Sequence, residues 1–152
     1  MVQTIALGAD HGAFTQKNDL KKHLEERGIK VLDFGCFSEE SCDYPDFAYP
    51  AAKAVAEKKA DLGIVLCGSG IGASITANKV KGIRCALVDD PKWAKITREH
   101  NDSNVLAMGG RVLDSAQMIE IADIWLDTPF SGDPRHQRRI DKIREAEVRE
   151  EE

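Results

Sequence analysis

Short apolar runs alternate with helix-patterned segments along the whole chain, and this alternation restricts the fold more than any other feature of the sequence. Five of the runs have the length and composition of buried β-strands. Because a helical segment separates each run from the next, the order predicts βαβ units, in which helices cover both faces of a parallel sheet. The predicted strands are Thr4 to Gly8, Ile29 to Phe34, Leu62 to Leu66, Ile83 to Val88 and Val105 to Met108.

The fold class that follows is α/β: a three-layer αβα, Rossmann-like arrangement with a parallel sheet of about five strands and an additional C-terminal helix. Trp93 and Trp125 fall on helix faces, so both are expected in the core. The segment from Asp114 to Leu126 is so apolar that we expect neighbours to cover it on more than one face. No linker interrupts the pattern, which predicts one domain over residues 1–152. Its last helix, about 134–150, is expected to reach a neighbouring subunit.

Charge and cysteine content narrow the functional classes. The formal net charge of −5 argues against nucleic-acid binding as the main role. No apolar run approaches the roughly 18 residues that a membrane span needs, and the N-terminus lacks the features of a signal peptide. We therefore expect a cytoplasmic protein with reduced thiols. No C-x-x-C spacing occurs, so neither a zinc site nor a redox pair is expected among Cys36, Cys42, Cys67 and Cys85.

Reactive side chains follow the predicted strands. Asp10 and His11 come after the first strand, Cys67 ends the third, and Arg111 follows the fifth. The helix after the fourth strand ends in His100-Asn101. In open α/β sheets, ligands bind beyond the carboxyl ends of the strands. We therefore expect carboxylate, imidazole, thiol and guanidinium groups to gather on one rim.

The glycine loop after Cys67 permits two chemical interpretations. The spacing Gly68-x-Gly70-x-x-Ala73, with Asp89 roughly 20 residues further on, fits a dinucleotide-binding fingerprint. That motif, however, follows the third strand rather than the first, and it gives Cys67 no task. Alternatively, the loop amides and the helix N-terminus form an anion site whose field stabilises a thiolate. A thiolate beside N–H donors suits a reaction in which a proton leaves carbon and negative charge develops on oxygen.

Cations gather near the C-terminus. Arg135 and Arg139 are four residues apart, which places both on one helical face. Two planar guanidinium groups suit a phosphate. The alternative is a surface stripe that pairs with nearby acids such as Asp133 and Asp141.

Several short motifs occur in order over nearly the whole chain. They are Asp10-His11-Gly12, Ser41-x-Asp43-Tyr44-Pro45-Asp46, Cys67-Gly68-Ser69-Gly70-Ile71-Gly72, Ala77-Asn78-Lys79, Gly82-Ile83-Arg84, His100-Asn101 and Arg135-His136-x-x-Arg139. This ordered set resembles the type B ribose-5-phosphate isomerases and the related isomerases of allose and galactose 6-phosphates. The presence of Cys67 resembles the branch that uses a cysteine rather than a glutamate further along the loop. One departure is the segment Gly132-Asp133-Pro134-Arg135-His136, where the family usually reads Gly-Gly-Arg-His.

The resemblance implies interconversion of ribose 5-phosphate and ribulose 5-phosphate without metal or cofactor. It implies a homodimer, or a dimer of dimers, with the active site at the subunit interface. In that scheme Cys67 moves a proton between C2 and C1 through a cis-enediol, and Ser69 handles the proton between O1 and O2. His100 assists opening of the furanose ring. The resemblance makes Cys67, His100, Ser69 and Asp10 the catalytic group.

The resemblance also assigns the binding residues. The loop amides hold the enediolate oxygens; they belong to Gly68, Ser69, Gly70, Ile71 and Gly72. Asp10, His11, Asn101 and Arg111 contact the substrate, and Arg135 and Arg139 take the phosphate together with His11.

Alternatives from other classes remain open from the sequence. A hexose 6-phosphate isomerase would use the same proton-transfer residues. An NAD(P)-dependent oxidoreductase would place a pyrophosphate on the glycine loop and would bind a nicotinamide cofactor. A non-catalytic phosphate- or nucleotide-binding module would keep its ligand after Cys67→Ala. A metal hydrolase would recruit Asp10, His11 and His100 and would respond to chelators.

Overall fold

One sheet of five parallel strands forms the centre of the molecule, which the computed structural model describes over all residues, 1–152. The strand order is β2-β1-β3-β5-β4, so β3 is central and β2 and β4 are the edges. The predicted three-layer α/β fold is confirmed, although β4 is shorter than the run of apolar residues from which it was predicted. The strands are β1 (Thr4–Ala9), β2 (Lys30–Asp33), β3 (Leu62–Cys67), β4 (Cys85–Leu87) and β5 (Val105–Gly109).

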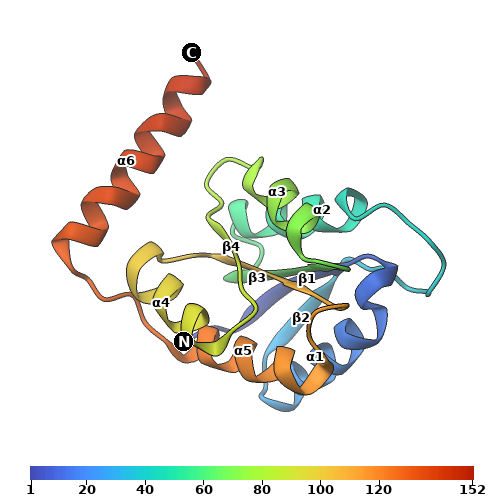
Figure 1. The fold of residues 1–152 in the computed structure, drawn as a ribbon. Helices are drawn as coiled ribbons and strands as arrows, with labels where there is room; N and C mark the ends of the chain where they lie inside the picture. Colours follow the sequence, from blue (N-terminus) through green and yellow to red (C-terminus); the bar gives the residue numbers. More distant parts are fainter.

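Helices cover both faces of the sheet (Figure 1). One layer holds α1, α4 and α5, and the other holds α2 and α3. A 3₁₀ turn, η1 (His11–Ala13), precedes the first helix. No helix combines the length and the apolar character that crossing a membrane requires. The helices are α1 (Phe14–Glu26), α2 (Pro45–Ala56), α3 (Ile71–Asn78), α4 (Pro91–Asn101), α5 (Ser115–Asp127) and α6 (Pro134–Glu150).

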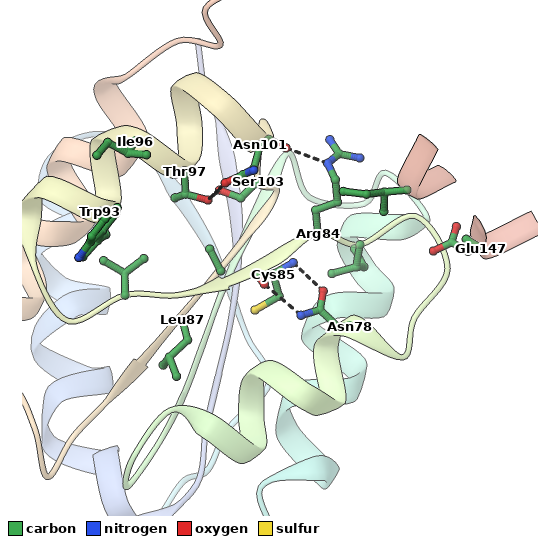
Figure 2. Close-up of a pocket in the computed structure, with 14 residues that line it drawn as sticks. Asn78, Arg84, Cys85, Leu87, Trp93, Ile96, Thr97, Asn101, Ser103 and Glu147 are labelled. Atoms are coloured by element: carbon green, nitrogen blue, oxygen red, sulfur yellow. Dashed lines mark hydrogen bonds between the residues drawn. The ribbon is translucent and has the colours of Figure 1, made fainter. Parts of the chain in front are cut away.

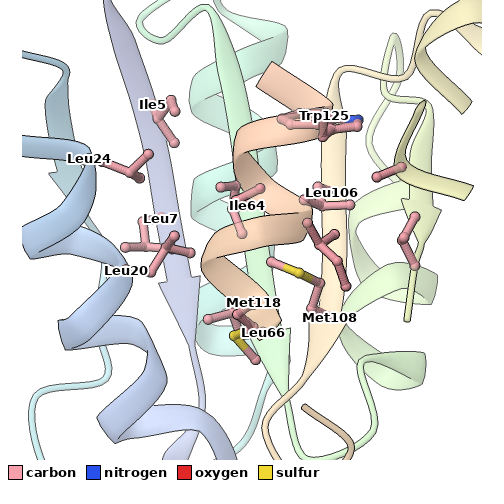
Figure 3. Packing of buried hydrophobic residues seen from close by; sticks show 14 of the residues in the cluster. Ile5, Leu7, Leu20, Leu24, Ile64, Leu66, Leu106, Met108, Met118 and Trp125 are labelled. Atoms are coloured by element: carbon pink, nitrogen blue, oxygen red, sulfur yellow. The ribbon is translucent and has the colours of Figure 1, made fainter. Parts of the chain in front are cut away.

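Large apolar side chains fill the space between the sheet and the helix layer formed by α1, α4 and α5. Leu20 and Leu24 of α1 approach β1, while Met118 and Trp125 of α5 lie over the central strands (Figure 3). Trp125 is fully buried, as predicted, and the apolar helix α5 packs against α1 and α4 as well as against the sheet. The prediction for Trp93 is wrong: this side chain is 50% exposed. It lies beside the edge strand β4, where no further strand or helix of this chain covers it.

The direction of each helix decides which edge of the sheet its ends reach. α4 starts just after β4, at the carboxyl edge, and ends just before β5 begins, at the amino edge. α6 extends away from the body of the molecule (Figure 1), and only His136 and Ile140 of this helix are buried. The fold therefore exposes two separate sets of polar groups, one beyond the carboxyl ends of the strands and one where α4 meets the start of α6.

Candidate active site

Three loops meet at the carboxyl ends of β1, β3 and β5, and their backbones interlock. Gly110 N–H donates to the Cys67 carbonyl at 2.9 Å, and Arg111 N–H donates to the Gly68 carbonyl at 2.9 Å. Gly12 packs so closely that an added Cβ would lie 2.9 Å from the Gly68 nitrogen. The rim that the sequence predicts therefore exists for these three loops.

Cys67 is the last residue of β3, and its side chain points at the first turn of α3. The residue is 4% exposed, and the Gly70 N–H donates to its Sγ at 3.2 Å. Gly70 caps α3 with a left-handed backbone, at φ +80°. The backbone N–H at the N-terminus of α3 is thus aimed at the sulfur. Ser69 is exposed next to it, and its Oγ accepts the Ile71 N–H at 3.1 Å.

A cavity of about 530 Å³ opens over this loop, a size that suits a small-molecule ligand. Asp10 enters it from the end of β1; this carboxylate is 6% exposed and accepts the Gly12 N–H at 2.9 Å. The lining of the cavity combines polar and apolar groups. The lining residues are Asp10, Tyr44, Cys67, Gly68, Ser69, Ile71, Gly72, Ile75, Arg111 and Val112.

His11 follows the cavity residue Asp10 in the chain but is not part of the cavity lining. Its hydrogen bonds define which ring nitrogen is free. Its Nδ1 accepts the Cys42 N–H at 3.2 Å, and the Cys42 sulfur lies 3.8 Å from the same nitrogen. The neutral ring therefore carries its proton on Nε2, which leaves an N–H group to donate to an anion.

Two residues that the sequence reasoning missed hold these loops in place. Lys17, at 1% exposure, donates to both carboxylate oxygens of Asp33 at 2.9 Å and to the Cys36 carbonyl at 2.7 Å. This contact anchors the segment that leads to Cys42. Gln16 donates through Nε2 to the Gly110 carbonyl at 2.7 Å and so fixes the turn that carries Arg111. Both lie on α1, where they resemble ordinary polar surface positions in the sequence.

His100 and Asn101 do not join this rim within one chain, which corrects the expectation from the sequence. α4 runs back across the sheet, so its last turn lies at the amino edge, opposite the end of β3. There the Asn101 carbonyl accepts a hydrogen bond from Arg84 Nε at 3.0 Å, just before β4 begins. The rule that ligands bind beyond the carboxyl ends of the strands applies to the loop after each strand. It does not apply to residues at the far end of the helix that follows.

A second polar cluster forms where α4 meets α6. The rings of His100 and His136 stack with their centroids 4.1 Å apart. Arg135 is next to them, and Arg139 follows one turn later on exposed helix. Asp133 accepts the Arg135 N–H at 2.8 Å, and this hydrogen bond holds the pKa of Asp133 below its ordinary value. The longer segment before the arginines thus supplies an N-cap and a first-turn proline to α6.

A larger hollow, which we call the edge groove, lies along the free edge of β4 (Figure 2). Its volume is about 690 Å³. Three of its apolar side chains, Leu87, Trp93 and Ile143, are each close to half exposed. The groove also includes Asn101, so it adjoins the cluster formed by His100 and His136. Apolar side chains around the Cys67 cavity are likewise exposed; they are Ile71, Ile75 and Val112.

Fold and site together define an α/β protein with a thiol in the lining of a cavity of small-molecule size. A family model described as ribose/galactose isomerase matches residues 5–143. A Bacillus subtilis protein named as a putative sugar phosphate isomerase is 51% identical over 94% of this chain and 96% of its own length. Ribose-5-phosphate isomerase B of Escherichia coli is 44% identical over 97% of this chain and 99% of its own.

Solved structures agree with these sequence matches. Ribose-5-phosphate isomerase B of Clostridium thermocellum has a TM-score of 0.94 and 45% identity, covering 97% of this chain and 99% of that one. The Mycoplasma genitalium enzyme, solved with bound ribulose-5-phosphate, has a TM-score of 0.93 and 40% identity over 97% and 98% of the two chains. The chain belongs to the ribose/galactose isomerase family, as the resemblance predicted. It is an isomerase.

Proposed function

We propose that the protein interconverts ribose 5-phosphate and ribulose 5-phosphate, with Cys67 as the base. The observation that carries the proposal is the hydrogen bond from the Gly70 N–H to the Cys67 sulfur at the floor of a 530 Å³ cavity. Full-length similarity to ribose-5-phosphate isomerases supports the choice of substrate. Allose and galactose 6-phosphates are the alternative substrates, because the proton-transfer chemistry is common to both sugar lengths.

In the proposed reaction the Cys67 thiolate removes the proton from C2 of the open-chain aldose. The C–H electron pair becomes a C1=C2 double bond, and the carbonyl electrons move to O1. Amide N–H groups of Gly68 to Gly72 stabilise the resulting cis-enediolate. Ser69 handles the proton between O2 and O1, and Cys67 returns its proton to C1, which leaves the carbonyl at C2. No atom or electron is gained or lost, so the reaction needs no cofactor.

We further propose that a second copy of this chain completes each active site. Cys67 and His100 lie at opposite edges of one sheet, so a single chain cannot present both to one sugar. Apolar surface surrounds both clusters, and covering it is favourable. A twofold homodimer would place the His100 cluster of each chain over the Cys67 cavity of its partner. The extended helix α6 supports this arrangement, and a dimer of two such dimers is compatible with it.

The second cluster then supplies ring opening and phosphate binding. His100 takes the proton of the anomeric hydroxyl while the ring oxygen leaves C1 and is protonated. Arg135 and Arg139 bind the phosphate with His11 from the other chain, and Asn101 and Arg111 contact the sugar. We place the enzyme in the cytoplasm, where its four free thiols stay reduced.

The direct test is incubation with ribose 5-phosphate in deuterated water. Ribulose 5-phosphate should form, with solvent deuterium at the exchanging carbon. Cys67→Ala should lose turnover while its circular dichroism stays that of the wild type. Parallel assays with allose 6-phosphate and galactose 6-phosphate decide the sugar length. Absence of turnover with all three sugars would refute the proposed function.

A further inference from the structure

His136 contacts both functional groups of the second cluster, although the proposed reaction gives it no task. It lies in the first turn of α6 and is 6% exposed, whereas Arg135 before it and Gln137 after it are exposed. One face of its ring stacks on His100 at 4.1 Å, with 28° between the planes. Its two ring nitrogens have separate partners: Nε2 lies 3.3 Å from the Arg135 guanidinium, and Nδ1 lies 3.0 Å from Ser131 Oγ.

These partners determine where the ring proton resides. A guanidinium can only donate, so Nε2 must present its lone pair to Arg135. The ring proton therefore lies on Nδ1 and is donated to the Ser131 hydroxyl oxygen, which also accepts the Asp133 N–H at 3.2 Å. In this tautomer both ring nitrogens of His136 are engaged.

The contacts restrict two side chains that are otherwise free to move. Arg135 has a side chain 56% exposed, and its contact with the Asp133 carboxylate is long at 3.8 Å. The lone pair of His136 gives this guanidinium one fixed acceptor. His100 is exposed at the end of α4, and the buried ring of His136 is a flat surface that limits its rotation.

We propose that His136 is a positioning residue that orients His100 for ring opening and Arg135 for phosphate binding. The inference rests on the proposed function, since it takes the roles of His100 and Arg135 from it. One buried imidazole thereby couples the ring-opening group to the phosphate-binding group. Its two effects are separable because they depend on different parts of the ring.

Two substitutions separate these effects. His136→Phe keeps a flat ring against His100 but removes the acceptor for Arg135. We expect KM for ribose 5-phosphate and the inhibition constant of inorganic phosphate to rise about tenfold, with kcat within about twofold of wild type. A tenfold loss of affinity is what removal of one hydrogen bond from a charged donor should cause. His136→Gln keeps an acceptor oxygen near Arg135 but removes the ring. We expect its kcat with ribose 5-phosphate to fall about tenfold, with KM almost unchanged.

Ribulose 5-phosphate identifies the step that is affected. Its O5 is esterified, so it cannot close a furanose ring, and exchange of its C1 hydrogen with deuterated water requires no ring opening. His136→Gln should exchange this hydrogen at the wild-type rate while it converts ribose 5-phosphate slowly. In a His100→Asn background, His136→Gln should cause no further loss of kcat. Gln137→Ala, the exposed neighbour on the same helix, should leave every constant unchanged.

The outcomes are distinct. If both variants lose kcat and affinity equally, or if neither variant changes, the positioning role is overturned. Turnover by the wild-type protein would still support the proposed function in that case. A wild-type protein that fails to convert the sugar refutes the proposed function first. Nitrogen NMR of the wild-type ring tests the inference even if the variants fold poorly. We expect His136 to be protonated on Nδ1 at neutral pH, and protonation on Nε2 contradicts the inference.

Discussion

Replacing Gly70 by alanine would perturb the loop conformation and the Cys67 hydrogen bond together. Gly70 has φ +80°, a conformation that costs an L-residue about 1–2 kcal/mol. An added Cβ would also lie 2.6 Å from Leu87 Cδ1 and 2.8 Å from the Met108 carbonyl carbon. The Leu87 side chain is able to move aside, but Met108 belongs to the fully buried strand β5. The loop must therefore shift, and the Gly70 N–H moves away from the sulfur.

The catalytic effect follows from that hydrogen bond. A hydrogen bond to a charged group contributes about 1.5–3 kcal/mol. Each 1.36 kcal/mol corresponds to a factor of ten in rate, so loss of the bond lowers kcat/KM about 10- to 150-fold. The free energy of unfolding should fall as well, by about 2–5 kcal/mol, because the clash adds to the backbone strain.

Gly28→Ala is the matched control. Gly28 has φ +82°, but nothing lies within 4 Å of an added Cβ, and the residue follows α1 far from the cavity. This variant should lose about 1–2 kcal/mol of stability and keep wild-type kcat/KM. Urea unfolding and steady-state kinetics on both variants supply the comparison. A Gly70→Ala enzyme with wild-type kcat/KM would refute the role assigned to the Gly70 amide.

Three further predictions follow from buried or hydrogen-bonded groups. Burial raises the pKa of Cys85 to about 12, so iodoacetamide at pH 8 should leave it unmodified; mass spectrometry that finds an adduct there would contradict this. Lys17→Met leaves the Asp33 carboxylate without its buried partner and should cost about 3–5 kcal/mol in urea unfolding. Adding Asp33→Leu should recover part of the loss, because the Cys36 carbonyl and the Gly35 N–H still lack their partners. Hydrogen bonds from the Gln3 and Thr4 amides lower the pKa of Asp61, so its carboxylate stabilises the fold above its unfolded pKa, and this contribution disappears as pH falls through the folded value. The stability difference between wild type and Asp61→Asn should therefore shrink on acidification below about pH 4, and a constant difference would count against it.

The alternation of apolar runs predicts the sheet and the helices because each element must bury one face against the same core. The carboxyl-end rule likewise brings Asp10, Cys67 and Arg111 to one rim. The edge strand explains where the pattern fails. Apolar periodicity marks Trp93 as buried, but it does not reveal that β4 has a free edge.

The missed residues share one property: their partners are distant in sequence. Gln16 bonds to Gly110, and Lys17 bonds to Asp33, so only tertiary packing identifies them. His136 is quoted in the basic motif, but its stack on His100 depends on how α6 approaches α4. His100 falls outside the rim for a different reason: it ends α4, which returns to the amino edge of the sheet, so the carboxyl-end rule does not apply to it.

Subunit complementation tests the shared active site most directly. Cys67→Ala and His100→Ala homodimers should each be about 100-fold or more below wild type, the usual loss for a proton-transfer group. Random reassociation makes about half of the dimers mixed, and each mixed dimer has one site with both residues intact. The account therefore predicts recovery of about one quarter of wild-type activity. A mixture in which mixed dimers form and activity stays at the level of the parent variants would contradict it.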